Sequence, residues 1–268
     1  MHAVPDLSPE ARAAEEALFT LADAGKAKTA ARYFQSGPGQ YGEGDQFLGI
    51  RVPVIRETAR QFNTLTLDDC AALLQSPYNE VRLLALDILV RRFAKGKADV
   101  QTAVYACFMQ HRHRINNWNL VDGSAPYISG PYLLQRDRSV IWELAGSDVL
   151  WDRRIAVLTT FAFIRAGDLD DALKLYARLL NDPHDLMHKA CGWMLRELGK
   201  RDEARLLAFL QTHYTALPRT TLRYAIEKFT PAQRAAMLKG DFRPDSANGS
   251  ANQGITGSGT HRGQSASS

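Results

Sequence analysis

The sequence predicts an all-α fold, an α-solenoid built from tandem helical repeats. Strand signals are weak, because no alternating run of β-branched residues persists and no Asn-Gly or Asp-Gly hairpin joins two such runs. Similar helical stretches recur along the chain at 81–93, 151–163, 186–198 and 221–229. The 268 residues, 45% hydrophobic and 23% charged, have the composition of a globular protein long enough for a sizeable core.

The first predicted element is a helix near the N-terminus. Ser8, Pro9 and Glu10 supply a capping residue, a first-turn proline and an acid, which together are typical of a helix start. We expect this helix to continue along the apolar run that stops at Gly25.

A long irregular segment, FQSGPGQYGEGDQFLGIRVP at residues 34–53, comes next. It is rich in Gly and ends at Pro53, which indicates a loop. We expect the loop to be ordered, because three of its residues can anchor it to a core: Phe47, Leu48 and Ile50.

The four recurrent stretches have a common period. When Leu83, Arg154, Lys189 and Arg223 are aligned, the last three are spaced by 35 and 34 residues, and the first gap of 71 is two such periods. A further repeat is therefore predicted near residue 118, which is Trp118. Two positions beyond the aligned residue, each repeat has a small or apolar residue expected in the core: Ala85, Leu120, Ala156, Cys191 and Ala225.

The aligned position and the one four residues later lie on one face of each helix. We call this set the stripe, and its pairs are Leu83/Asp87, Trp118/Asp122, Arg154/Leu158, Lys189/Trp193 and Arg223/Glu227. A core face is uniformly apolar, whereas the stripe mixes aromatic, acidic and basic residues. Because stacked helices lie about 8–10 Å apart, we expect a continuous wall that acts as a binding surface.

The composition of the segments outside the repeats, together with the cysteines, predicts the domain boundaries and the cellular compartment. From residue 241 the composition turns to Ser, Gly, Asn and Gln, so we assign 1–240 to the repeat domain and 241–268 to a disordered tail. The N-terminus lacks the features of a signal peptide, and no apolar run approaches the roughly 20 residues of a membrane helix. Three isolated cysteines favour a reducing cytoplasm over a disulfide framework or a zinc site.

Basic residues are concentrated in the later part of the chain. Residues 1–78 have 7 Lys/Arg against 10 Asp/Glu (net −3), and residues 79–240 have 24 against 17 (net +7). This asymmetry suits a polyanion, although a solvated face with surplus lysines is an equal alternative from charge alone. On the stripe, Arg154, Lys189 and Arg223 can neutralise phosphates, and the indoles of Trp118 and Trp193 can pack on sugars or bases.

The carboxylate of Asp122 needs a separate reason, because an acid facing phosphates is unfavourable. Cleavage of an N-glycosidic bond creates an oxocarbenium-like sugar, which a nearby carboxylate stabilises while it orients the attacking water. A base alkylated at N3 or N7 is already cationic and leaves without a general acid. The simpler alternative is that Asp122 ends a helix, where Asp is common.

Four segments together resemble the AlkD-type DNA alkylation-repair glycosylases, over about residues 10–235. They are ARYFQSGPGQYGEGDQFLGIRVPVIRE, WNLVDGSAP, WDRRIAVL and HKACGWMLRELGK. The resemblance implies HEAT-like repeats with a concave, DNA-facing cleft. The cleft residues of that family match Trp118, Asp122, Arg154 and Trp193 here, and a DNA-facing aromatic residue matches Tyr33.

That family hydrolyses the N-glycosidic bond of cationic N3- and N7-alkylpurines in DNA, such as 3-methyladenine and 7-methylguanine, without metal or organic cofactor and without base extrusion. The resemblance therefore implies a cytoplasmic DNA N-glycosylase, monomeric and acting on double-stranded DNA of the bacterial nucleoid. Asp122 would stabilise the sugar, Trp118 and Trp193 would hold the backbone of the lesion nucleotide, and Arg154 would bind an adjacent phosphate. Asn119 departs from the Asp that relatives often have there.

Two alternatives accompany this interpretation. Buried tryptophans are usually core residues, and Trp118 and Trp193 can be explained that way. A fold does not guarantee its activity, so the rival function is a non-catalytic HEAT-like scaffold that binds DNA or a protein partner. The Gly-rich loop lacks GxxxxGK[ST] and no strand precedes it, so we expect it to line the DNA or to position Tyr33 rather than to bind a nucleotide.

Overall fold

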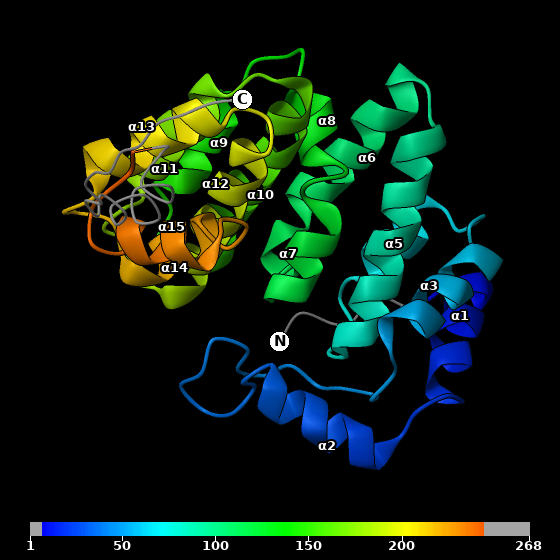
Figure 1. The fold of residues 1–268 in the computed structure, drawn as a ribbon. Coiled ribbons are helices and arrows are strands. Elements are labelled where there is room, and N and C mark those ends of the chain that lie inside the picture. The colour runs from blue at the N-terminus through cyan, green and yellow to red at the C-terminus, as the bar shows by residue number, and fades with distance from the viewer. Residues whose placement is uncertain (1–6, 244–268) are drawn as a thin grey trace, which may run out of the picture.

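The computed structural model describes residues 7–243, and all regular secondary structure in this range is helical, which confirms the all-α prediction (Figure 1). The first half contains α1 (Pro9–Phe19), α2 (Ala24–Tyr33), α3 (Val52–Gln61), α4 (Leu67–Leu73), α5 (Asn79–Lys95), α6 (Ala98–Gln110), η1 (Arg112–Arg114) and α7 (Trp118–Ser124). The second half contains α8 (Ser129–Leu133), α9 (Ser139–Ala145), α10 (Leu150–Ala166), α11 (Asp170–Arg178), α12 (Asp185–Gly199), α13 (Glu203–His213), α14 (Arg219–Ala225) and α15 (Pro231–Met237).

Helix α1 begins as predicted and ends earlier than predicted. The hydroxyl of Ser8 accepts a hydrogen bond from the backbone N–H of Ala11, and Pro9 occupies the first turn. The helix stops at Phe19 instead of continuing to Gly25, because Asp23 starts a second helix by accepting from the N–H of Lys26. A side-chain cap inside the predicted run therefore divides it into α1 and α2.

The five predicted repeats form a stack of helices. Helix α5 packs against α7, α7 against α10, α10 against α12, and α12 against α14. The residues predicted to face the core are all nearly inaccessible, with exposed fractions of 0% for Ala85, Leu120 and Ala156, 4% for Cys191 and 1% for Ala225. The repeat register is confirmed, and the stack is consistent with an α-solenoid.

Two apolar residues of the stripe are buried, Leu83 at 8% exposed and Leu158. Leu158 was expected on the exposed wall, but its exposed fraction is 0%. The reason is that α10 lies at the centre of the molecule and packs against α7, α8, α9, α11 and α12, which leaves little of its surface open. Arg154, one turn earlier, is at the end of α10 that reaches the wall.

A glycine brings the last two helices of the stack together. A Cβ added at Gly192 of α12 would lie 2.5 Å from the Cβ of Tyr224 and 2.7 Å from the carbonyl oxygen of Thr221, both in α14. Only glycine permits this close approach. As a result Trp193 and Tyr224 lie on the same side of the interface between α12 and α14.

The segment between α2 and α3 is an ordered loop, anchored by Phe47 and Leu48, which are 9% and 4% exposed. The buried carboxylate of Glu80 fixes its backbone, because it accepts from the N–H groups of Leu48 (3.0 Å) and Gly49 (2.9 Å). The expectation of an anchored loop is confirmed.

Two remaining expectations concern the C-terminal tail and the absence of a membrane-spanning helix. The predicted tail at 241–268 lies outside the described residues except for 241–243. Among the helices of residues 7–243, none combines the length and the apolar character that crossing a membrane requires.

Candidate functional site

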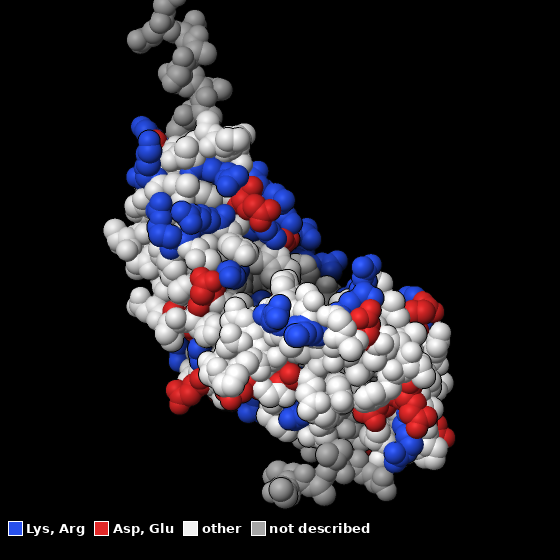
Figure 2. Space-filling model, turned by 90° about the horizontal axis from the view of Figure 1, so that it is seen from below, with Lys and Arg blue, Asp and Glu red and all other residues white. Residues whose placement is uncertain are grey.

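A cavity of about 430 Å³ opens between α2, α7, α10, α12, α14 and the loop that follows α2. Six of the seven predicted site residues line it: Tyr33, Trp118, Asp122, Arg154, Lys189 and Trp193. Sequence reasoning missed its other lining residues, Gln35, Tyr41, Leu186, Arg196 and Tyr224. Seen from below, the molecule is hollowed between its two halves, and Lys and Arg side chains gather along the edges of the hollow (Figure 2). We call the space lined by the six predicted and five other residues named above the aromatic cavity.

Asp122 and Arg154 form a bidentate ion pair in the wall of the cavity. The Nε and one terminal nitrogen of Arg154 each donate to one carboxylate oxygen of Asp122, both at 2.8 Å. The other terminal nitrogen donates to the carbonyl oxygen of Leu186 at 2.6 Å. The side chain of Arg154 is 6% exposed and that of Asp122 is 17% exposed, so the carboxylate is the part of the pair that the cavity can reach.

This geometry bears on the two interpretations of Asp122, as a catalytic carboxylate or as the end of a helix. Helix α7 continues through Gly123 to Ser124, so Asp122 does not end it and its side chain is directed at Arg154. Arg154 has a partner for each guanidinium nitrogen. Its contact with a phosphate stays a prediction. Its neighbour Arg153 is directed away and pairs with Asp182 at 2.6 Å.

Trp118 belongs to an aromatic cluster that forms one side of the cavity. Its indole stacks on Phe34 with a centroid distance of 5.0 Å and an interplanar angle of 25°, and it meets Tyr33 edge-on at 5.8 Å. Tyr33 is 67% exposed, which places an aromatic ring at the mouth of the cavity. Trp118 and Trp193 are both half-buried and line the same space, so neither is a core residue only.

The cations of the cavity differ in how they are held. Lys189 of α12 pairs with Asp185 one turn earlier at 2.8 Å, and this hydrogen bond raises the pKa of the lysine, which favours its cationic form. The side chain of Lys189 is 41% exposed and can reach a ligand. Arg196, one turn beyond Gly192, pairs with Glu227.

Arg223 does not join the others. It lies on α14 and is exposed, and its neighbour Tyr224 lines the cavity in its place. The stripe partner of Arg223, Glu227, follows the end of α14 at Ala225 and is bound by Arg196. A contact between Arg223 and DNA stays a prediction.

Tyr41 is a cavity residue that the repeat pattern could not indicate, because it lies on the loop between α2 and α3. The Gly-rich loop carries it between the aromatic cluster and α12, where its ring lies 5.9 Å from that of Trp151 and 6.2 Å from that of His184. Burial raises the pKa of its phenol and lowers the pKa of His184, so burial favours the neutral form of both. An aromatic residue between glycines was the only sequence signal for it.

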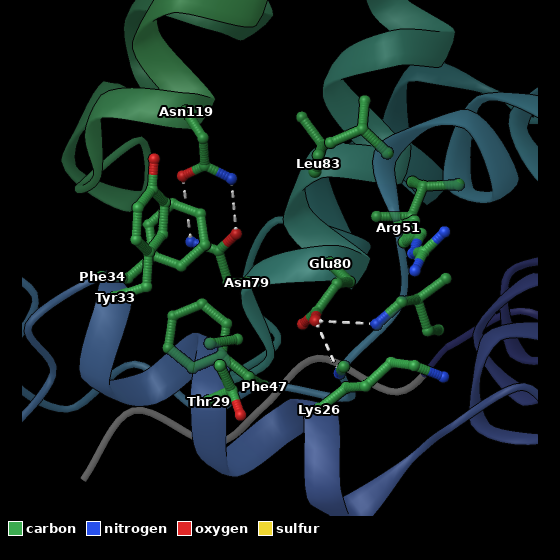
Figure 3. A pocket seen from close by; sticks show the side chains of 15 residues that line it. Lys26, Thr29, Tyr33, Phe34, Phe47, Arg51, Asn79, Glu80, Leu83 and Asn119 are labelled. Carbon is green, nitrogen blue, oxygen red and sulfur yellow. Dashed lines mark hydrogen bonds between the residues drawn. The ribbon is translucent and has the colours of Figure 1, made fainter.

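A second hollow, of about 350 Å³, lies on the other side of Tyr33 and Phe34 (Figure 3). Asn119 borders this hollow and donates a hydrogen bond to the side chain of Asn79 at 2.7 Å. Asn119, at the position where relatives often have Asp, therefore takes part in an amide pair and does not line the aromatic cavity. Its difference from the family pattern leaves the pair of Asp122 and Arg154 unchanged.

Within residues 7–243, no cluster of three or more His, Cys, Asp or Glu side chains has an arrangement that could hold a metal ion. The three cysteines are free thiols and buried, and burial raises the pKa of Cys70 and Cys191 to about 12, which disfavours reactive thiolates.

Comparisons with known proteins identify the family and a similar fold. The family model for the DNA alkylation repair enzyme matches residues 14–229. A solved structure described as a predicted DNA alkylation repair enzyme from Enterococcus faecalis is similar in fold, with a TM-score of 0.62 at 16% identity, over 79% of this chain and 98% of that chain. No curated protein sequence matches the chain. Because the family model covers most of the sequence, the chain belongs to the DNA alkylation repair enzyme family.

Proposed function

We propose that this DNA repair protein is a DNA N-glycosylase that hydrolyses the N-glycosidic bond of cationic N3- and N7-alkylated purines. Its substrate is double-stranded DNA with a lesion such as 3-methyladenine or 7-methylguanine, and it acts as a cytoplasmic monomer without a cofactor. The observation that carries this proposal is the carboxylate of Asp122, partly exposed in a cavity between two indoles and fixed by Arg154.

The chemistry of the lesion explains why one carboxylate suffices. The alkylated base is positively charged and leaves as a neutral purine, so no general acid is required. Positive charge passes to the deoxyribose as the bond breaks, and the carboxylate of Asp122 stabilises it electrostatically. The faces of Trp118 and Trp193 supply additional attraction for the cationic sugar and hold it near the acid.

We assign Arg154 to orienting Asp122 rather than to binding a phosphate. A bidentate pair fixes both carboxylate oxygens and adds geometric specificity to the interaction. It also offsets the acid's charge, which reduces the repulsion between Asp122 and a phosphate backbone nearby. Lys189, cationic and 41% exposed, is the residue we assign to a backbone phosphate.

The test is release of methylated base from methylated duplex DNA by the purified protein. Asp87→Asn is a matched control for Asp122→Asn, because Asp87 occupies the same repeat position in α5, is 14% exposed and also pairs with an arginine, Arg91. We expect wild type and Asp87→Asn to release 7-methylguanine and 3-methyladenine, and Asp122→Asn to be slower by at least about a hundredfold. DNA binding without release by the wild type would instead support the non-catalytic scaffold.

A further inference from the structure

A buried carboxylate, that of Asp45, joins the Gly-rich loop between α2 and α3 to the helix that carries Asp122. We propose that Asp45 is a positioning residue of the glycosylase site, which fixes the first turn of α7 and thereby the placement of Trp118 and Asp122. The inference rests on the proposed function, and it assigns a role to a residue that does not itself line the aromatic cavity.

The carboxylate of Asp45 is surrounded by hydrogen-bond donors. The side chain is 2% exposed and accepts hydrogen bonds from four side chains, those of Arg82 (2.5 Å), Asn117 (3.0 Å), Asn79 (3.1 Å) and Asn116 (3.3 Å). Two of these donors belong to the first turn of α5, and the other two belong to the segment directly before α7. One carboxylate therefore holds the start of α7 against the start of α5.

Two series of hydrogen bonds lead from Asp45 into the first turn of α7. In the first, Asn117 donates to Asp45, and as the N-cap its side-chain oxygen accepts from the backbone N–H of Trp118 at 2.9 Å. In the second, Asn79 donates to Asp45 and exchanges two hydrogen bonds with Asn119 of α7, at 2.7 and 3.4 Å (Figure 3). The first turn is thus fixed through two separate side chains.

Helix α7 depends on such contacts because it is short. It has seven residues, a length at which an isolated helix is marginal in water. Trp118 lies in its first turn and Asp122 lies one turn later on the same face, and both line the aromatic cavity. A shift or rotation of α7 would therefore move the indole and the carboxylate together.

The backbone beside Asp45 is fixed as well. The N–H of Gln46 donates to the carbonyl oxygen of Pro77 at 3.0 Å, and the N–H of Asn79 donates to the carbonyl oxygen of Gln46 at 2.8 Å. These two bonds join the loop to the residues that lead into α5. The carboxylate is therefore presented to α7 from a rigid backbone.

The network around Asp45 also has costs to stability. The ion pair of Asp45 and Arg82 is buried, and burial of two charges carries a large desolvation penalty. Among the described residues, the Nε of Arg82 and the side-chain oxygen of Asn116 are buried without a hydrogen-bond partner, which is unfavourable for each atom. The geometry that the network imposes on α7 explains these costs better than stability does.

Placement of α7 matters for catalysis because the sugar must be held within a fraction of an ångström of Asp122 when the bond breaks. A loosened α7 would hold the acid in several positions, few of which are productive. DNA affinity depends on exposed cations such as Lys189, which this change leaves in place. Loss of the tether to Asp45 therefore lowers the rate of bond cleavage more than it lowers DNA affinity.

The test uses Asn117→Ser, which separates the tether from the cap. Serine is a favourable N-cap residue, so an acceptor for the first turn is kept, but it has no amide to donate to Asp45. In single-turnover release of 7-methylguanine, we expect Asn117→Ser to be about tenfold slower and Asp45→Asn at least as slow. The Kd for DNA that contains a tetrahydrofuran site should stay within twofold of wild type. Rates are compared at a temperature at which urea titrations show each variant to be folded.

The matched control is Tyr176→Phe, which also removes one buried side-chain hydrogen bond, that between Tyr176 of α11 and Thr160 of α10. Neither residue lines the aromatic cavity, so we expect the wild-type rate. A wild-type rate for Asn117→Ser, or a loss confined to Kd, contradicts the proposal. An equal loss of rate in Tyr176→Phe also contradicts it, because the effect would then follow stability alone.

A second readout is independent of activity. The backbone N–H of Val121 donates to the carbonyl oxygen of Asn117 at 3.1 Å, and in Asn117→Ser we expect its hydrogen exchange to be about tenfold faster, with the amides of α12 unchanged. Unchanged exchange in α7 contradicts the coupling even if the wild type releases no base. Absence of release together with faster exchange overturns the proposed function and keeps the coupling between the loop and α7.

Discussion

The pair of Asp122 and Arg154 makes a prediction that separates two roles for the arginine. If Arg154 orients the carboxylate, its replacement lowers stability and rate but removes no phosphate contact. If it binds a phosphate, its replacement reduces the salt dependence of DNA binding. The variants are Arg154→Gln, Asp122→Asn and the double variant, which keeps the net charge of the pair at zero.

The magnitude follows from the two hydrogen bonds of 2.8 Å. Hydrogen bonds to charged groups contribute about 1.5–3 kcal/mol each, and the 17% exposure of Asp122 lets water replace part of that interaction. We therefore expect Arg154→Gln to lower the free energy of unfolding by about 3 kcal/mol. A double-mutant cycle should give a coupling energy of about 2 kcal/mol between the two residues.

The assay is the slope of log K for duplex DNA against log salt concentration. Each phosphate contact contributes about 0.9 to this slope. The orienting role predicts that the double variant keeps the wild-type slope, because Arg154 is already neutralised by Asp122 in the wild type. A slope reduced by about 0.9 in the double variant, together with a coupling energy near zero, would refute the reasoning.

Three further predictions address neighbouring residues. Lys189→Ala should lower the salt slope by about 0.9 for all duplex sequences, because the exposed ammonium is assigned to a phosphate; an unchanged slope removes that assignment. Asp45→Asn should lower the free energy of unfolding by about 3 kcal/mol in urea titrations, because the buried guanidinium of Arg82 loses its counter-ion; a change below 1 kcal/mol contradicts this. Burial raises the pKa of Tyr105 to about 12, so the folded state keeps a proton that the unfolded state loses near pH 10. The free energy of unfolding should therefore be full below pH 10 and fall between pH 10 and 12, with a smaller slope in Tyr105→Phe; equal slopes would count against it.

The helical stack and most of the cavity could be predicted because both follow a period. Residues spaced by one repeat occupy equivalent positions on stacked helices, so alignment of Lys189 with Arg154 was enough to place Trp118 and Trp193 on the same wall. The same register predicted the buried residues two positions on. The prediction that Leu158 is exposed was wrong because the period treats all helices of the stack as equivalent, whereas α10 is enclosed by neighbours on several sides.

What the sequence could not predict depends on irregular backbone and on long-range pairs. Tyr41 and Asp45 reach the site through a loop without periodicity, whose path is fixed by contacts with residues 32 to 72 positions away in the chain. The pairing of Arg154 with Asp122 depends on the rotation of α7 relative to α10. The repeat register predicts which face of its helix each residue occupies, but it does not predict this rotation. The sequence therefore indicated that Arg154 lies on the wall but not that it pairs with Asp122.

The central claim is that the carboxylate of Asp122 carries out base release, and single-turnover kinetics on a duplex with one 7-methylguanine test it most directly. We predict that Asp122→Asn loses at least about a hundredfold in rate while its affinity for DNA with a tetrahydrofuran site is retained, and that Asp87→Asn keeps the wild-type rate. Equal rates of release by wild type and Asp122→Asn would contradict the account.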